Sequence, residues 1–444
     1  MPAAEGVGPL TVRAGFVRDL WRDYDSSLAV EDSVLGELAD PMGHEPVDPA
    51  ADSVARVITL SPTVGQFVHS DADVVMVYSA RGEGKRCQNG TPVLTPTGWV
   101  KIEDLKTGDR VIAGDGTVTT VDGVYPHPPQ PLWTLVFSDG TSAVTGDEHL
   151  WAVVTEHYRA GRGRPRSGRG GRPYRPRQIV TTEQIREKLG RGARAPWSIP
   201  LLSAPAQFPA RSVPLDPYLL GLLLGDGCFT PPSVRFITAD EELLPTMKNL
   251  LPPGIDIGAR GRYAYVLRRT SRIRNPVMAA VRALGLAGRR AWEKFVPTMY
   301  LWSSSPVRLA VLQGLMDTDG HAARGSTLFT TTSERLAQDV VFLVQSLGGT
   351  AVTTQRPAAK GSRRPSFRVT VRMPGGLIPF RLTRKADVFR RWKSARNEPS
   401  RYIVACEPAG EGAATCIRVA HPSGLFVIQD FLVTHNTVGA IARL

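Results

Sequence analysis

Two stretches of this chain repeat one pattern of small, apolar and acidic residues. Residues 219–227 read LLGLLLGDG and residues 312–320 read LQGLMDTDG. Each has leucines and a glycine at helical spacing, followed by a terminal Asp-Gly. The glycines, Gly221 and Gly314, would allow two helices to pack closely. We therefore expect a pair of related helices at the centre of an α/β domain.

Each repeat also places an acid where a helix disfavours it. Asp226 and Asp319 would lie at the C-terminal ends of the two helices, where the helix dipole is negative. If the helices pack together, the two carboxylates meet and can bind a divalent cation. A lone Asp-Gly is usually only a turn that ends a helix, but two matched copies disfavour that interpretation.

The chain also contains two separated parts of a phosphate-binding loop. Residues 74–78, VVMVY, predict a buried strand, and residues 79–87, SARGEGKRC, supply glycines and Lys85. The expected hydroxyl residue and helix do not follow. They occur instead at residues 437–444, TVGAIARL, so joining Arg86 to Thr437 would restore the order strand, loop, hydroxyl and helix. Residues 87–436 therefore interrupt one loop.

Composition narrows the class of protein. The 444 residues are 42% hydrophobic and contain no apolar run long enough to span a bilayer, so we expect a cytoplasmic protein with no membrane partner. The net charge of +13 predicts a polyanionic partner. The few scattered cysteines disfavour a disulfide framework or a CxxC metal site, which leaves a nucleophile as one use for a thiol; they are Cys87, Cys228, Cys406 and Cys416.

One segment has most of the excess charge. Residues 159–177, RAGRGRPRSGRGGRPYRPR, contain eight arginines among glycines and prolines and no acid. Such a segment cannot form a core, so residues 159–213 are predicted to be a basic, disordered insert and linker. A solvated loop and a DNA-binding arm are both open interpretations of the arginines.

The remaining chain divides by its residue patterns. Turns such as TPTG, AGDGT and SDGT between short apolar runs predict an all-β region at residues 87–158, and β character returns at 392–436. Between them, residues 214–391 alternate helix-like and strand-like stretches, which predicts an α/β domain. Residues 1–86 and 437–444 are the two flanks of the interrupted loop.

The repeated stretches resemble the two LAGLIDADG motifs of the dodecapeptide homing endonucleases. The context LDPYLLGLLLGDG, and EKFVPTMY before LQGLMDTDG, is similar to endonucleases carried inside inteins. The resemblance implies that Asp226 and Asp319 bind Mg²⁺ and that a monomer cuts double-stranded DNA. Basic residues are expected beside each acid: Lys294 lies 68 residues after Asp226 and Lys385 lies 66 after Asp319. Ordinary surface lysines are the alternative.

The β regions resemble the two halves of a Hedgehog/intein splicing domain. CQNGTPVLTPTGWVKIEDLKTGDRV is similar to its N-terminal block, VTGDEHLWAV to its Thr-to-His block, and LFVIQDFLVTHNT to its C-terminal block. The resemblance assigns Thr145 and His149 to polarising the upstream peptide bond and protonating its nitrogen. It assigns His435 to the downstream junction.

The residues at the junctions have the chemistry that splicing needs. Cys87 can attack the carbonyl of Arg86 and form a thioester. Thr437 then takes the acyl group, Asn436 cyclises and cuts the chain after itself, and an acyl shift joins Arg86 to Thr437. Splicing needs no cofactor.

The flanks, FVHSDADVVMVYSARGEGK and TVGAIARL, resemble the Walker A region of the large terminase subunit of tailed phages. That resemblance implies that Lys85 holds ATP with Mg²⁺ only in the complete host ATPase, after splicing. It also implies that the protein is found in an infected or prophage-carrying bacterium. The leading hypothesis is thus an intein with an inserted homing endonuclease. The alternatives are a splicing domain with a remnant that only binds DNA, and a working ATPase with a decorative insertion.

Overall fold

The computed structural model describes residues 10–12, 56–58, 86–155, 178–192, 197–272, 274–323, 326–358, 364–392 and 399–435. Lys85, Asn436, Thr437 and the arginine-rich segment lie outside the described residues.

The chain separates into two compact units, one of residues 1–83 with 438–444 and one of residues 84–437. In the first unit, β1 (Leu10–Val12) and β2 (Arg56–Ile58) form an antiparallel pair. The predicted phosphate-loop strand at 74–78 lies outside the described residues.

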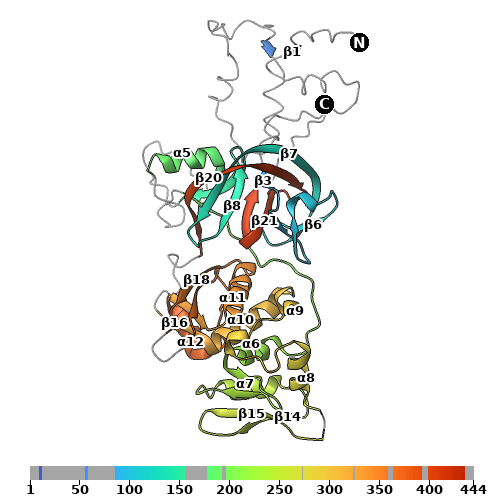
Figure 1. Cartoon of the computed structure of the whole chain (residues 1–444), viewed down its shortest axis with the longest axis vertical. Coiled ribbons are helices and arrows are strands. Elements are labelled where there is room, and N and C mark those ends of the chain that lie inside the picture. The colour runs from blue at the N-terminus through green and yellow to red at the C-terminus, as the bar shows by residue number, and fades with distance from the viewer. Residues whose placement is uncertain are drawn as a thin grey trace, which may run out of the picture. The chain divides into compact units, whose positions relative to one another are not determined.

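The second unit contains a β domain built from both ends of residues 87–435 (Figure 1). Its larger sheet has the strand order β10-β9-β11-β20-β3-β8-β7-β6, and its smaller sheet has the order β22-β21-β4-β5. Strands from the N-terminal part are β3 (Cys87–Gln88), β4 (Pro92–Leu94), β5 (Trp99–Lys101), β6 (Arg110–Ile112), β7 (Val118–Phe137), β8 (Ser142–Gly146) and β9 (Leu150–Thr155). Strands from the C-terminal part are β20 (Arg401–Val419), β21 (Leu425–Ile428) and β22 (Leu432–His435). The short 3₁₀ helices η2 (Ile102–Asp104) and η5 (Gln429–Phe431) follow β5 and β21.

Local sequence explains the turns of this domain. The AGDGT and SDGT segments form tight turns in which Gly116 and Gly140 have φ of 87° and 84°, a conformation that glycine adopts without steric cost. The long strands β7 and β20 pair along most of their length, with several register shifts that bend them (Figure 1). The two halves of the domain are therefore joined by main-chain hydrogen bonds as well as by a shared core.

The prediction of a disordered insert and linker across residues 159–213 is wrong for the described residues of 178–199, whereas residues 200–213 contain no helix or strand. Residues 178–199 contain β10 (Gln178–Thr181), α5 (Thr182–Gly190) and β11 (Trp197–Ile199), and both strands pair with β9. The Thr181 and Gln184 side chains form a capping box that starts α5. These elements were not predicted because the strands have only three or four residues and the capping signal is short, next to a segment with an arginine-rich composition.

The α/β domain consists of two copies of one αββαββα unit. The first has α6 (Pro217–Asp226), β12 (Gly227–Cys228), β13 (Arg235–Ile237), α7 (Leu243–Leu250), β14 (Ile255–Ala259), β15 (Ala264–Arg269) and α8 (Pro276–Ala283). The second has α10 (Ser305–Asp319), β16 (Gly320–Ala323), β17 (Ser326–Thr331), α11 (Glu334–Ser346), β18 (Thr350–Arg356), β19 (Ser366–Arg372) and α12 (Thr383–Trp392). Between the copies lie η3 (Ala291–Glu293) and α9 (Thr298–Leu301).

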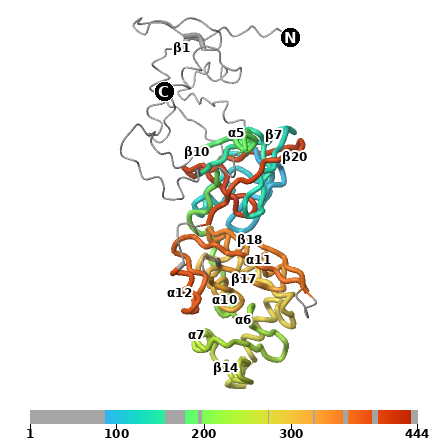
Figure 2. Tube along the Cα trace, turned by 90° about the vertical axis from the view of Figure 1, so that its left-hand side faces the viewer, coloured from blue at the N-terminus to red at the C-terminus, as the bar shows by residue number. Residues whose placement is uncertain are grey.

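The sheets of the two copies have equivalent strand orders, β12-β13-β15-β14 and β16-β17-β19-β18. In each sheet one face packs on helices, as α11 does on β17, β18 and β19 (Figure 2). Phe236, Leu267, Phe329 and Val369 are buried on that face. Their neighbours along the strands are more exposed, as expected for a sheet covered on one side.

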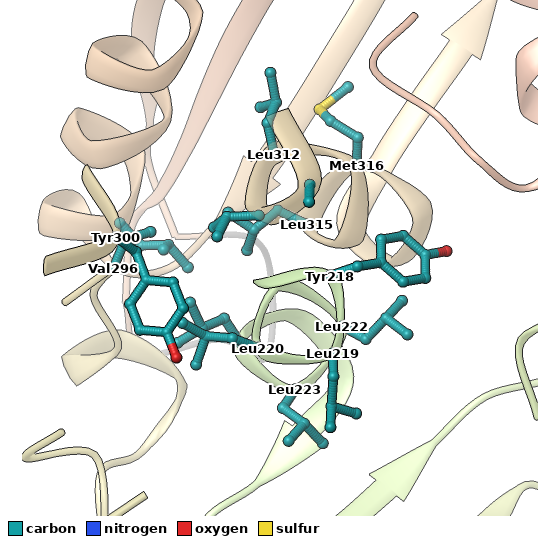
Figure 3. Packing of buried hydrophobic residues seen from close by; sticks show 14 of the residues in the cluster. Tyr218, Leu219, Leu220, Leu222, Leu223, Val296, Tyr300, Leu312, Leu315 and Met316 are labelled. Atoms are coloured by element: carbon teal, nitrogen blue, oxygen red, sulfur yellow. The ribbon is translucent and has the colours of Figure 1, made fainter. Parts of the chain in front are cut away.

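The helices α6 and α10 form the centre of this domain (Figure 3). Their leucines point outward into a core shared by both copies, and Gly221 and Gly314 face each other where the helices meet. A Cβ added to Gly221 would lie 2.9 Å from the Gly314 Cα, closer than non-bonded carbons pack. The glycines thus let the two helix backbones touch. Among the helices that the structure describes, none has the length and apolar character to cross a membrane.

Candidate functional site

The first candidate site surrounds the peptide bond between Arg86 and Cys87. Cys87 begins β3, where it pairs with Thr145 of β8 on one side and with Thr415 of β20 on the other. The main-chain N–H of Gly146 donates a 2.9 Å hydrogen bond to the Arg86 carbonyl oxygen. This donor withdraws electron density from the carbonyl that a nucleophile would attack.

His149 connects the two ends of the domain. Its Nδ1 lies 3.9 Å from Cys87 Sγ, and its Nε2 lies 2.6 Å from Thr434 Oγ1 in β22. His149 is 1% exposed and its ring packs at 5.0 Å from the ring of Trp151. An imidazole held at both nitrogens in this way can move a proton at the Cys87 junction.

Among the described residues, no cation lowers the pKa of the Cys87 thiol. Burial raises the pKa of its thiol far above the usual value, and the nearby Cys416 adds to that effect. Near neutral pH the group is therefore a thiol, and attack requires that a base remove its proton. His149 Nδ1 is placed to do so.

Thr145 has a different environment from His149. Its side chain is fully buried, and its hydroxyl shares a 3.1 Å hydrogen bond with the Thr182 hydroxyl at the start of α5. The Trp151 indole N–H also donates to Thr182 Oγ1, at 3.2 Å. Thr145 thus ties β8 to α5, while its neighbour Gly146 supplies the hydrogen bond to the Arg86 carbonyl.

The downstream junction begins at the end of β22. Every residue of β22 is buried, and His435, its last residue, pairs with Leu425 of β21. Because Thr434 binds His149, the strand that carries His435 is attached to the histidine beside the upstream junction. The fold therefore brings residues from both ends of the 87–435 segment to one place, and Asn436 and Thr437 follow directly in sequence.

The second candidate site lies at the C-terminal ends of α6 and α10. Burial, together with the neighbouring carboxylate of Asp226, raises the pKa of Asp319 to about 6. Burial also raises the pKa of Asp226. Two carboxylates that are held close together in a partly buried place are costly without a cation between them.

Lys294 and Lys385 are buried rather than at the surface, so the alternative of ordinary surface lysines is wrong. Lys294 Nζ donates to the carbonyls of Gly225 and Gly227 at 2.8 and 2.7 Å. Lys385 Nζ donates to several carbonyls at the end of α10, with Asp317 O and Gly320 O both at 2.7 Å. Each lysine therefore binds carbonyl groups that the helix end leaves unpaired.

The acids and lysines of the second site affect one another. Burial lowers the pKa of Lys294 to about 8, although the charges of Asp319 and Asp226 oppose that shift. Burial likewise lowers the pKa of Lys385. Within the described residues, no cluster of three or more His, Cys, Asp or Glu side chains could hold a metal ion. Asp226 and Asp319 supply carboxylate oxygens, the ligands that hard divalent cations prefer, and such a cation would take its other ligands from a bound phosphate and water.

Sequence reasoning missed three residues of the first site: Gly146, Thr182 and Thr434. Gly146 acts through its main-chain N–H, so no residue pattern marks it. Thr182 and Thr434 are ordinary strand or helix-start residues until the fold places them beside Thr145 and His149. The position of Thr434 directly before His435 was the only available sequence signal.

Comparison with protein families identifies part of the α/β domain. Residues 306–373, which begin in α10 and end after β19, match the family model of the LAGLIDADG-like domain. This match includes Asp319 and the second copy of the repeat.

The curated relatives include replicative DNA helicases DnaB and the protein RecA. A replicative DNA helicase DnaB of Mycobacterium intracellulare is 28% identical over 378 residues, which are 82% of this chain and 61% of that protein. Protein RecA of Mycobacterium bovis is 27% identical over 313 residues, 64% of this chain and 35% of that protein. The chain thus spans less than two thirds of the length of these relatives. Neither is a terminase, so the comparisons do not support the terminase resemblance of the flanks.

Among solved structures, a DnaB intein (MchDnaB-1) overlaps 79% of this chain and 98% of its own, with 12% identity and a TM-score of 0.23. The homing endonuclease I-DmoI in complex with DNA and Mn overlaps 36% of this chain and 89% of its own, with 16% identity and a TM-score of 0.25.

Proposed function

We propose that residues 87–436 excise themselves from the chain, join Arg86 to Thr437, and carry a DNA endonuclease that cuts double-stranded DNA. The observation that carries the splicing proposal is the linkage of Cys87, His149 and Thr434, which come from opposite ends of the segment. Catalysis at two junctions requires that they be brought together, and a linkage from Cys87 through His149 to Thr434 supports this.

The upstream step uses the groups around Cys87. His149 Nδ1 accepts the thiol proton while its Nε2–H is held by the Thr434 hydroxyl. The sulfur attacks the Arg86 carbonyl carbon, and the Gly146 N–H stabilises the negative charge on the carbonyl oxygen. His149 then returns the proton to the Cys87 nitrogen as the peptide bond breaks, leaving a thioester and a free amine. Thr145 holds β8 so that Gly146 stays in place.

The downstream steps use the residues after β22. The Thr437 hydroxyl attacks the thioester and releases the Cys87 thiol, which leaves the acyl group on Thr437. The Asn436 side-chain amide then attacks its own carbonyl, and His435 donates a proton to the departing Thr437 nitrogen. That amine finally displaces the ester oxygen, so a peptide bond links Arg86 and Thr437.

The splicing proposal is tested at each junction separately. Asn436→Ala should retain thioester formation, so added thiol should release residues 1–86 from it. Cys87→Ala should not release that fragment, because the nucleophile is gone. Mass spectrometry of the full chain measures both outcomes, and equal thiol-induced release from the two variants would refute the role of Cys87.

The endonuclease proposal rests on the second site and on the LAGLIDADG-like match. Asp226 and Asp319 would hold Mg²⁺, which when bound would stabilise the charge that develops on phosphate oxygens. Lys294 and Lys385 would bind the free carbonyls at the helix ends and partly neutralise the charge of the acids. The exposed ends of the sheets carry Arg235, Arg269 and Arg372, which suit phosphate contacts.

The DNA target proposed for this endonuclease is the sequence that encodes Arg86 followed directly by Thr437, because the insertion splits that site and protects its own gene. Incubation of the full chain with such DNA and Mg²⁺ should give a double-strand cut. Binding without cutting under the same conditions would favour the other candidate, a splicing domain with an inactive remnant.

The flanking residues are proposed to be parts of a host phosphate loop. In this proposal Lys85 binds ATP with Mg²⁺ only after splicing has joined its loop to the segment at 437–444, whose sequence predicts a helix. Nucleotide binding by the unspliced chain would contradict this and favour a working ATPase.

A further inference from the structure

The turn between β21 and β22 has an unusual backbone. Asp430 and Phe431 have φ of 56° and 54°, and they are the non-glycine residues of the described chain with positive φ. Side-chain-bearing residues rarely adopt this left-handed conformation, so the surrounding structure must hold it in place. The turn leads directly into the strand that carries Thr434 and His435.

Arg401, the first residue of β20, holds this turn. Its side chain has no exposed surface. Its Nη1 donates to the Phe431 carbonyl at 3.1 Å, and its Nη2 donates to the Asp430 carbonyl at 3.0 Å. The planar guanidinium therefore binds both carbonyls of the left-handed pair, which a single ammonium group could not do in the same geometry.

Asp139 completes the arrangement. Its Oδ2 lies 2.6 Å from Arg401 Nε, and its side chain is only 3% exposed. Its other oxygen accepts hydrogen bonds from the N–H and hydroxyl of Thr141 in the β7–β8 turn. Removal of either ionic partner would leave the other charge buried and unpaired, which is strongly destabilising for the local geometry.

The opposite side of the turn is covered by aromatic rings. The Phe431 ring lies 5.4 Å from the Trp99 ring of β5 and 5.2 Å from the Phe342 ring of α11. The turn is therefore held by an ion pair on its main chain and by ring packing on its side chain. Three residues later, Thr434 binds His149. A change in the direction of this turn would move β22 and its two site residues.

We propose that Arg401, bound to Asp139, is a positioning residue for the downstream half of splicing. It holds the Asp430–Phe431 turn so that β22 presents His435 to the junction that follows it. The inference rests on the proposed splicing function. Arg401 is not part of the upstream bond-breaking groups, so its loss should affect the two junctions unequally.

The test compares the two junctions in the full chain. In a Cys87→Ala background, only Asn436 cyclisation can occur, and Asp139→Asn or Arg401→Lys should slow release of residues 437–444 by about tenfold or more, since displacement of a reacting group by ~1 Å costs about 100-fold. In an Asn436→Ala background, the same substitutions should slow thiol-induced release of residues 1–86 at least about threefold less than the downstream step, because they reach His149 only through Thr434.

The control is Asp240→Asn, which breaks a more exposed Asp–Arg pair with Arg384 in the α/β domain. It should leave both rates unchanged. Equal slowing at both junctions, or slowing at neither, would overturn the proposal for Arg401. Unfolding of Arg401→Lys still leaves Asp139→Asn as the deciding variant, with its folding checked by thermal unfolding. If Cys87→Ala alone shows no downstream cleavage and Asn436→Ala no thiol-induced release, the proposed splicing function fails instead.

Discussion

The two candidate sites reach reactivity by opposite means. The splice site has single residues from distant parts of the chain, and its nucleophile is a buried neutral thiol whose pKa burial raises. The site in the α/β domain has two copies of each charged residue, because it lies on the axis of an internal repeat. There burial raises the pKa of Asp319 to about 6 and lowers that of Lys294 to about 8.

This difference follows from what each reaction needs. Splicing transfers acyl groups within the chain, so proximity and one proton carrier are sufficient, and a dry site protects the thioester from water. Cutting a phosphodiester places new negative charge on oxygens, which a cation must stabilise. A repeated structure supplies the paired acids for that cation without any further sequence information. The two sites should therefore respond independently to substitution.

The largest expected effect separates the sites by their charges. Asp226→Asn and Asp319→Asn should each lower DNA cleavage by at least about 1,000-fold, because each removes a metal ligand worth several kcal/mol of charge stabilisation. Both variants should still bind the target DNA and splice normally. Gel assays of cleavage and splicing measure the two activities, and a folded variant that lost splicing would show that the sites are coupled.

A smaller effect is expected from the link between the ends of the β domain. Thr434→Val keeps the shape of the side chain but removes the hydroxyl that binds His149 Nε2. Thiol-induced cleavage at Cys87 should fall about 10- to 100-fold, since a general base in the wrong tautomer loses much of its contribution. Thr119→Val, at another buried threonine of the same domain, is the control. An unchanged rate in Thr434→Val would show that contacts other than the Thr434 hydroxyl orient His149.

Metal binding should depend on pH while splice-site assembly does not. The folded pKa of Asp319 is about 6 against an ordinary 3.8, so deprotonation of this group destabilises the metal-free protein as pH rises through about 6. Mg²⁺ binds the deprotonated form, so its apparent affinity should fall about fivefold between pH 6 and pH 5. The Mg²⁺-induced rise in Tm, measured from pH 5 to 7.5, tests this. A constant rise across that range would exclude Asp319 as a ligand.

Helix contact should matter for the second site alone. Gly221→Ala places a methyl group against the Gly314 backbone, and overpacking of this kind costs about 1–3 kcal/mol. Thermal unfolding should show a lower Tm and DNA cleavage should weaken, since the helix ends move apart. Gly190→Ala, where a Cβ would meet no atom within 4 Å, serves as the control. Equal effects of the two substitutions would contradict a specific role for the contact.

The smallest effect is expected from the arginine-rich segment. Deleting residues 159–177 removes eight positive charges and should weaken DNA binding several-fold and flatten its salt dependence, without stopping splicing. Binding measured at several salt concentrations gives the slope. An unchanged slope would identify the segment as a solvated loop that does not contact DNA.

Particular elements show how far sequence reasoning reached. The repeat with its glycines and acids predicted α6 and α10 and the contact between Gly221 and Gly314, because helical period and the lack of a side chain are local properties. The AGDGT and SDGT segments likewise predicted the turns that the structure contains. In contrast, residues 178–199 were misassigned to a linker because their strands are short and gain their stability from pairing with β9.

The sequence by itself determined which groups are chemically available: a cysteine and a His-Asn-Thr run at the two junctions, and paired acids at the helix ends. Only the tertiary structure decided how they are held. In the fold, the Gly146 N–H donates to the Arg86 carbonyl and the Thr434 hydroxyl binds His149 Nε2. Lys294 and Lys385 bind carbonyls at the helix ends, and Arg401 binds the carbonyls of the left-handed turn. These contacts join residues that are far apart in the chain or act through the main chain, so no local pattern of side chains encodes them.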